Sequence, residues 1–201
     1  HASNTIRFYN WRVTDAAGNA GISTSTSNTY IVDTKAPVVS TKNITVQLDS
    51  SGSIEITADM VDDGSSDGFD IASMTLSQTN FDCSHLGANT LTLTVTDEYG
   101  NSDSAEAIVT VEDTTPPVVV TRNITIQLDD TGNASITVAG IDNGSADACG
   151  IASMTLSQYD FDCSHVGDNT VTLTVTDVNG NIDTATAIVT VEDITVPVVV
   201  T

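Results

Sequence analysis

The chain has 201 residues and a formal net charge of −22, with 27 Asp and Glu against five Lys and Arg. A surface this negative lacks the cations that neutralise nucleic-acid phosphates, and it is equally unsuited to an anionic membrane surface. No apolar run reaches the roughly 18 residues of a membrane-spanning helix, so we expect neither nucleic-acid partners nor membrane insertion of this segment.

The first 35 residues do not begin like a complete protein. The opening "HASNTIRFYNWRVTD" has no initiator Met and no signal peptide. It continues through "VTDAAGN", ending at Asn19, to the acidic and proline-marked exit "IVDTKAP" that contains Asp33. We interpret residues 1–35 as the C-terminal part of a preceding immunoglobulin-like domain, and the whole sequence as a fragment of something longer.

The remainder of the chain consists of two similar copies of one sequence. When residues 37–116 are laid on 117–196, 51 of the 80 positions are identical without a gap. A period of 80 residues is too long for a solenoid repeat and fits a small self-contained domain. We therefore expect a first repeat at 36–116, a second repeat at 117–196, and the start of a third at 197–201.

Within a repeat, alternating apolar residues predict strands. In the first repeat we expect strands at 38–48, 53–60, 71–78, near Phe81, at 89–96 and at 104–112. "TLTLTVT", for example, places Leu91, Leu93 and Val95 on one face against threonines, as in a strand with one buried side. Short strands separated by Gly, Asn and Asp turns predict an all-β fold of tandem immunoglobulin-like β-sandwich domains in a string.

Three cysteines bear on how such small domains are stabilised. Cys83 and Cys163 occupy the same position in the two repeats, whereas the counterpart of Cys149 is Phe69. The economical interpretation is a Cys149–Cys163 disulfide inside the second repeat, with Cys83 left as a buried thiol beside Phe69; the alternative is free thiols throughout. A bridge would indicate an oxidising compartment. The "CSH" motifs have too few partners for a zinc site or a nucleophile.

Acidic loops recur at every expected junction. Of the acids, 22 are Asp, which prefers turns and hard-cation sites. In this sandwich the 62–67 and 97–101 loops face the exit of the preceding domain, so three acidic segments converge with no basic residue among them. Ca²⁺, which takes six to eight oxygen ligands, would relieve their repulsion. The predicted ligands are Asp33, Asp62, Asp67, Asp97 and Asn101 at the first junction, and Glu112, Asp113, Asp142, Asp147, Asp177 and Asn181 at the second.

A purely structural interpretation of these loops stays open. Asp-x-x-Gly-Asn is also an ordinary hairpin turn, in which Asp and Asn cap backbone amides and Gly takes a positive φ. The recurrence of the motif three times, next to an acidic exit each time, is what favours calcium over a turn alone.

The motifs also carry a family resemblance. "VEDTTPPVVV", "NITVQLD" and "DACGIASMTLSQ" resemble the tandem repeats of very long bacterial surface adhesins, most of all those that gliding bacteria export by type IX secretion, and more distantly the hyalin-repeat immunoglobulin-like family. The resemblance implies a non-enzymatic, fibre-forming protein at the bacterial cell surface, with calcium sites in related strings. Phe69 departs from the paired-cysteine pattern.

The resemblance favours one function over two others. We expect a structural stalk of an adhesin, stiffened by Ca²⁺, whose partners are neighbouring repeats and other chains of a fibre. A glycan-binding module is the alternative, with Trp11, Tyr99 and Tyr159 as candidate platform residues; an enzyme is not expected, because active sites are rarely copied every 80 residues. Asp-Ser/Thr triplets resemble O-glycosylation sites of gliding bacteria at Ser104, Thr114 and Thr184.

Overall fold

The computed structural model describes residues 4–6, 13–14, 16–17, 20–21 and 30–196. Internal contacts divide the chain into two compact units. The first consists of 1–44, 56–79 and 89–109, and the second of 45–55, 80–88 and 110–201. The segments 45–55 and 80–88 of the first repeat therefore belong to the same unit as the second repeat.

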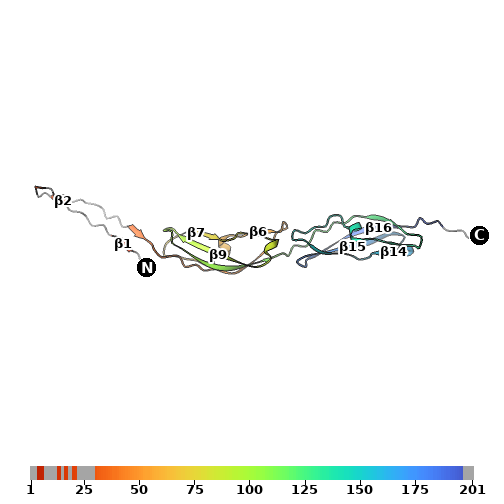
Figure 1. Cartoon of the computed structure of the whole chain (residues 1–201), viewed down its shortest axis with the longest axis horizontal. Helices are drawn as coiled ribbons and strands as arrows, with labels where there is room; N and C mark the ends of the chain where they lie inside the picture. The colour runs from red at the N-terminus through yellow and green to blue at the C-terminus, as the bar shows by residue number, and fades with distance from the viewer. Residues whose placement is uncertain (1–3, 7–12, 15, 18–19, 22–29, 197–201) are drawn as a thin grey trace, which may run out of the picture. The chain divides into compact units, whose positions relative to one another are not determined.

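Almost all regular structure is β (Figure 1). Residues before the first repeat contribute four short strands, of which β1 pairs with β4 and β2 with β3. Their bounds are β1 Asn4–Ile6, β2 Val13–Thr14, β3 Ala20–Gly21 and β4 Tyr30–Val32.

Both repeats use the same strands in the same order. In the second repeat a four-stranded sheet has the order β11-β16-β15-β13, with β11 parallel to β16, and β12 pairs with β14 in a separate two-stranded sheet. The first repeat has the orders β5-β10-β9-β7 and β6-β8. The bounds in the first repeat are β5 Ile44–Gln47, β6 Ser53–Glu55, α1 Ala58–Val61, β7 Ile71–Leu76, β8 Asn80–Asp82, η1 Cys83–His85, β9 Gly87–Asp97 and β10 Ser102–Glu112; those in the second are β11 Ile124–Gln127, β12 Asn133–Ser135, α2 Val138–Ile141, β13 Ile151–Leu156, β14 Asp160–Asp162, η2 Cys163–His165, β15 Gly167–Asp177 and β16 Ile182–Glu192.

The core of each sandwich follows the predicted alternation. Leu91, Leu93 and Val95 on β9 are buried, while the threonines between them are partly exposed. In the second repeat the buried side chains form one apolar cluster, which consists of Leu128, Ile136, Ile141, Leu156, Phe161, Val171, Leu173, Val175, Ala187, Val189 and Val191. The predicted all-β, immunoglobulin-like fold is confirmed.

Two predicted strands are shorter than expected. The segment 53–60 holds a strand only at β6, and the chain then turns through the four-residue helix α1. The segment 38–48 is paired regularly only at β5; before it, Val38 and Thr41 form single bridges to the 62–67 loop. The bend at α1 brings Val61 into the core, where it is fully buried.

Candidate functional site

A disulfide joins the two repeats. Cys83 on η1 of the first repeat is bonded to Cys149 of the second, with their Cα atoms 5.3 Å apart, and Cys163 is a free, exposed thiol. The predicted Cys149–Cys163 pairing and the predicted free Cys83 are therefore wrong. Both cysteines lie in the compact unit that consists of 45–55, 80–88 and 110–201.

The geometry of a single repeat explains why its own two cysteines do not pair. The residue after Cys149, Gly150, accepts a hydrogen bond at its carbonyl from the amide of Val178, at the end of β15. Cys163 lies on η2, which leads into the start of β15 at Gly167. An 11-residue strand spans roughly 35 Å, far more than a disulfide can bridge.

A glycine makes room for the bridge. Gly52 has a φ of +75°, and a Cβ built on it would lie 2.9 Å from Cys83 Sγ and 3.0 Å from the Cβ of Ala148. The Cys83 sulfur also lies 3.7 Å from the Gly52 carbonyl oxygen. The first repeat thus accommodates both Cys149 and its neighbour Ala148 against a position without a side chain.

Replacing Gly52 with alanine is expected to impair the inter-repeat bridge. Both Gly52→Ala and the control Gly64→Ala place a Cβ at positive φ, at a cost of about 1–2 kcal/mol each. Only Gly52→Ala also meets the sulfur and Ala148, because no atom of the described residues lies within 4 Å of a Cβ at Gly64. Thiol alkylation after oxidative refolding should show more free Cys83 in Gly52→Ala than in Gly64→Ala; equal bridging in the two variants would contradict the contact.

The acidic loops bring carboxylates together at the entry of each repeat. One oxygen each of Asp33, Asp67 and Asp97 lies within 4.8 Å of the others. The Oδ1 of Asp67 is buried and has no hydrogen-bond partner among the described residues, whereas its Oδ2 accepts from the Phe69 amide at 3.1 Å. We call these three residues the first acidic cluster.

An asparagine holds the acidic exit against the loop. The Asn101 side-chain nitrogen donates to the Asp33 carbonyl at 3.2 Å and to Asp97 Oδ2 at 2.8 Å. Asn181 makes the same two contacts, to the Asp113 carbonyl at 3.2 Å and to Asp177 Oδ2 at 2.7 Å. The contact of the exit segment with the Asp-x-x-Gly-Asn loop, inferred from sequence, is thus present in both copies.

The second copy gathers fewer carboxylates. Its group consists of Asp113, Asp147 and Cys149, whose sulfur is committed to the disulfide. Asp147 Oδ1 accepts from the amides of Cys149 and Gly150, at 2.8 and 3.1 Å. This oxygen is therefore already paired, unlike its counterpart in Asp67. Asp177, the counterpart of Asp97, is not in this group as far as the described residues show.

The other predicted ligands have local partners. Asp62 and Asp142 cap their own turns, accepting from the amides two and three residues ahead. Glu112 accepts at Oε2 from the side-chain nitrogen of Gln47, at 3.0 Å, on an exposed strand end. The structure does not bring these three residues into either group of carboxylates. The serine and threonines Ser104, Thr114 and Thr184 are exposed.

Two buried aspartates stabilise the Asp-x-x-Gly-Asn loops. Burial raises the pKa of Asp97, but hydrogen bonds from the Asn101 side chain and from the backbone of Asn101 and Tyr99 outweigh it, and the pKa lies below its ordinary value of 3.8. The pKa of Asp177 is lowered by the same balance between burial and hydrogen bonds, with Asn181 and Asn179 as donors. A folded-state pKa below the unfolded one contributes stability that is present above the unfolded pKa and is lost as the pH falls through the folded pKa.

The free energy of unfolding is accordingly expected to fall below about pH 4. Urea unfolding followed by circular dichroism between pH 7 and 3 measures it. The double variant Asp97→Asn, Asp177→Asn should start less stable at pH 7 and lose less on acidification. Protonation also relieves the repulsion within a net charge of −22, so a stability that rises below pH 4 would show that repulsion outweighs these hydrogen bonds.

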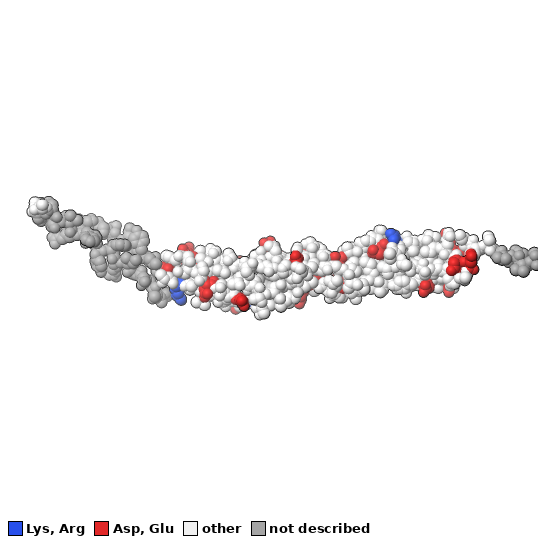
Figure 2. Space-filling model, in the orientation of Figure 1, with Lys and Arg blue, Asp and Glu red and all other residues white. Residues whose placement is uncertain are grey.

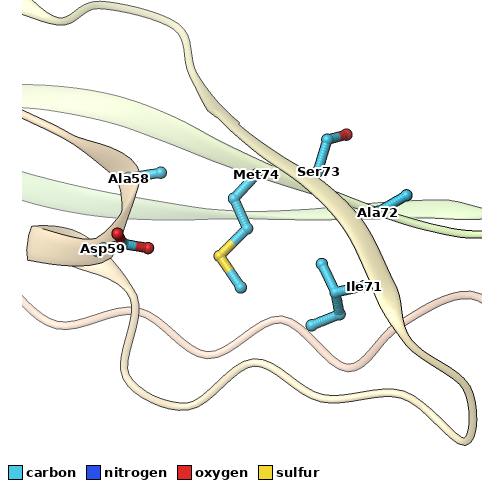
Figure 3. Close-up of a pocket in the computed structure, with 6 residues that line it drawn as sticks. All are labelled: Ala58, Asp59, Ile71, Ala72, Ser73 and Met74. Carbon is cyan, nitrogen blue, oxygen red and sulfur yellow. The ribbon is translucent and has the colours of Figure 1, made fainter.

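A shallow depression next to α1 is lined mostly by apolar side chains. It is lined by Ala58, Asp59 and 71–74, with a volume of about 450 Å³, and Figure 3 shows the α1 side chains across from those of β7. Asp59 is its one titratable lining residue and Ser73 its one hydroxyl. The exposed surface visible in Figure 2 is mostly uncharged, with scattered acids and few basic side chains.

The chain is similar in sequence to one curated protein. No family model matches the chain. It is 33% identical over 199 residues to hyalin from Strongylocentrotus purpuratus, covering 93% of this chain but only 16% of hyalin. The chain therefore corresponds to a small part of that relative.

Solved structures that are similar to the chain include domains 1–4 of Drosophila N-cadherin, with 12% identity and a TM-score of 0.44. Domains 1–4 of protocadherin gamma B7 have 12% identity and a TM-score of 0.39. Each match covers 96% of this chain and 67% of the other. Fibronectin(III)-like modules of CbhA from Clostridium thermocellum are also similar, with 9% identity and a TM-score of 0.30. That match covers 78% of this chain and 94% of the other. The chain itself contains two copies of an immunoglobulin-like β-sandwich repeat. None of its described helices has the length and apolar character needed to cross a membrane.

Proposed function

We propose that this chain is a structural stalk or fibre segment of a repetitive extracellular adhesin, with modules at 36–116 and 117–196. The observation that carries the proposal is the Cys83–Cys149 disulfide, which joins one copy of the repeat to the next. Such a bond opposes separation of neighbouring modules, which a chain under tension requires and an isolated binding domain does not. Its partners are the adjoining repeats of the same long chain and other chains of a fibre.

The proposed setting is the bacterial cell surface. The similarity to hyalin and the resemblance of the repeat motifs to adhesins of gliding bacteria both support an extracellular location. A disulfide also forms and persists in an oxidising compartment, such as the cell exterior. Export by type IX secretion, and O-glycosylation at the exposed Ser104, Thr114 and Thr184, remain predictions from that resemblance; an intact mass without added hexose would exclude the modification.

Ca²⁺ at the first acidic cluster is the second part of the proposal. Three carboxylates within 4.8 Å of one another repel, and the buried, unpartnered Oδ1 of Asp67 lacks the hydrogen bond that would offset its desolvation. A hard dication would satisfy both demands, because Ca²⁺ accepts carboxylate oxygens in flexible geometry. Bound there, it would tie the exit segment at Asp33 to the 62–67 and 97–101 loops and restrict bending of the chain before the first repeat.

The second group, with Asp113 and Asp147, is a weaker candidate. It has two available carboxylates, and one oxygen of Asp147 already accepts two amides. At that junction the disulfide provides the connection instead. We therefore propose that the two junctions are held by different means, the first by a cation and the second by a covalent bond.

The glycan-binding alternative has less support. Tyr99 packs edge-on against Phe69, with ring centroids 5.0 Å apart, and the Tyr159 hydroxyl accepts a hydrogen bond from the Leu156 amide at 3.0 Å. Both tyrosines thus take part in packing or in the backbone hydrogen-bond network, although both are exposed. Trp11 lies outside the described residues.

Calcium titration tests the cation proposal. Isothermal titration of the full chain is expected to show binding that Asp67→Asn weakens at least tenfold, because a carboxylate ligand becomes a neutral amide. Asp62→Asn is the matched control: it belongs to the same loop, caps its own turn and should leave the affinity unchanged. Equal calcium affinities in Asp67→Asn and the unmodified chain would show that the first acidic cluster is not the calcium site.

Small-angle X-ray scattering then tests the mechanical role. With millimolar calcium the full chain should give a well-defined maximum dimension, and excess chelator should make the profile more flexible. Asp67→Asn should resemble the chelated chain under both conditions. Superimposable profiles with and without calcium would mean that the ion, if bound, does not stiffen the segment.

A further inference from the structure

Cys163 is the exact positional counterpart, 80 residues on, of a cysteine that is bonded to the next repeat. Cys83 and Cys163 each open a three-residue 3-10 helix, η1 and η2, with the same sequence. Each helix is capped by the preceding Asp, whose carboxylate accepts from the serine amide at 2.9 and 2.8 Å respectively. The two sulfurs therefore have the same local scaffold, although one is bridged and the other is free and exposed.

The space that receives the partner is also present in the second repeat. Gly132 has a φ of +79°, and a Cβ on it would lie 2.8 Å from Cys163 Sγ. The sulfur faces the Gly132 carbonyl at 3.8 Å, as Cys83 faces that of Gly52 at 3.7 Å. A Cβ built on Gly52 would also meet Ala148 of the following repeat, whereas among the described residues only Cys163 lies within 4 Å of a Cβ built on Gly132. The second repeat thus has a glycine in the same position beside its cysteine.

We propose that Cys163 forms a disulfide with the counterpart of Cys149 in a repeat of the same type placed directly after residue 196, so that such repeats are linked one to the next in a single direction. Each repeat would offer one cysteine at the η helix to its successor and one in the 147–150 loop to its predecessor. The inference rests on the proposed function and extends it, since a bridge like Cys83–Cys149 would then recur between successive repeats.

Phe69 stands where Cys149 stands in the second repeat, and it packs on Tyr99. The first repeat therefore has no cysteine at this position to bond with a preceding module.

The chemistry needs only a low-molecular-weight disulfide, RS–SR, as oxidant. The Cys163 thiolate attacks RS–SR, forms a mixed disulfide and releases one RSH; the thiolate of the incoming cysteine attacks Cys163 Sγ and releases the second. Two protein thiols are oxidised and one RS–SR is reduced to two RSH.

An extended chain tests the proposal. Residues 197–201 repeat the letters of 117–121, so the full chain followed by a copy of 122–201 preserves the period. In the copy, the counterpart of Cys163 is changed to serine to remove the same-repeat alternative, and the counterpart of the exposed Ala152 is changed to serine to mark its peptide by mass. After oxidation with RS–SR, thiol titration under denaturing conditions and non-reducing peptide mapping are performed.

The expected result is no free thiol, with the Cys163 peptide linked to the marked peptide of the copy. The control extends the chain with phenylalanine at the counterpart of Cys149, as nature has at Phe69, and should retain one thiol, at Cys163. Gly132→Val in the extended chain should lower bridging at Cys163 and leave Cys83–Cys149 formed. If Cys163 and the added cysteine both stay free while Cys83–Cys149 forms in the same molecules, the chain is folded and the proposal is wrong.

Discussion

Replacing Phe161 with alanine is expected to destabilise the second repeat by about 3–5 kcal/mol, the usual cost of deleting a buried aromatic side chain. Phe161 on β14 is 2% exposed, belongs to the apolar cluster of that repeat and meets the His165 ring edge-on at 5.6 Å. A two-layer sandwich of 80 residues has a small hydrophobic core, so the loss of one buried side chain has a large effect on its stability. Urea unfolding followed by circular dichroism measures the change.

Val178→Ala is the control for this variant. Val178 is 56% exposed in the loop after β15, and a surface truncation of this kind changes stability by only about 0.5 kcal/mol. Near-equal stabilities of Phe161→Ala and Val178→Ala would mean that the Phe161 side chain is not part of the packed core.

Removing the inter-repeat disulfide is the second change with a large expected effect. Cys83 and Cys149 are 66 residues apart in sequence, and the loop-closure entropy of such a cross-link corresponds to about 4 kcal/mol. Cys149→Phe is the preferred variant, because the equivalent position of the first repeat already holds Phe69. The free energy of unfolding should fall by several kcal/mol, and reduction of the unmodified chain with dithiothreitol should lower it similarly.

Cys163→Ser separates this effect from a general sensitivity to cysteine loss. Cys163 is exposed and unbonded, so its replacement should leave the free energy of unfolding within about 0.5 kcal/mol of the original. A drop in Cys163→Ser as large as that in Cys149→Phe would indicate that the bridge is the same-repeat one.

The sandwich could be predicted from sequence because its signals are local. Alternation on β9 identified the buried Leu91, Leu93 and Val95, and the gap-free repeat indicated one fold copied twice. The helix α1 was missed because four residues are too short for a helical period to show. Its effect, a bend that buries Val61, depends on packing that no local pattern reports.

The acidic cluster was predictable in part. Loop positions in the sandwich identified Asp33, Asp67 and Asp97 as neighbours, but Asp62 belongs to the same loop and instead caps its own turn. Which carboxylate of a loop points outward and which folds back is decided by backbone amides two and three residues away. Residue type and spacing do not distinguish the two cases.

The disulfide was missed although a signal for it existed. The same topology that places the 142–147 loop beside the preceding repeat also places Cys149 there, close to the end of the first repeat that carries Cys83. Pairing cysteines only within a repeat ignored that placement. The length of β15, which separates Cys149 from Cys163, could also have excluded the shorter bridge.

Non-reducing peptide mapping of the full chain, alkylated before digestion, tests the central claim that neighbouring repeats are covalently fastened. We predict a linked pair of peptides that contain Cys83 and Cys149, and an alkylated Cys163. A Cys149–Cys163 link, or alkylation of all three cysteines after oxidative refolding, would contradict the account.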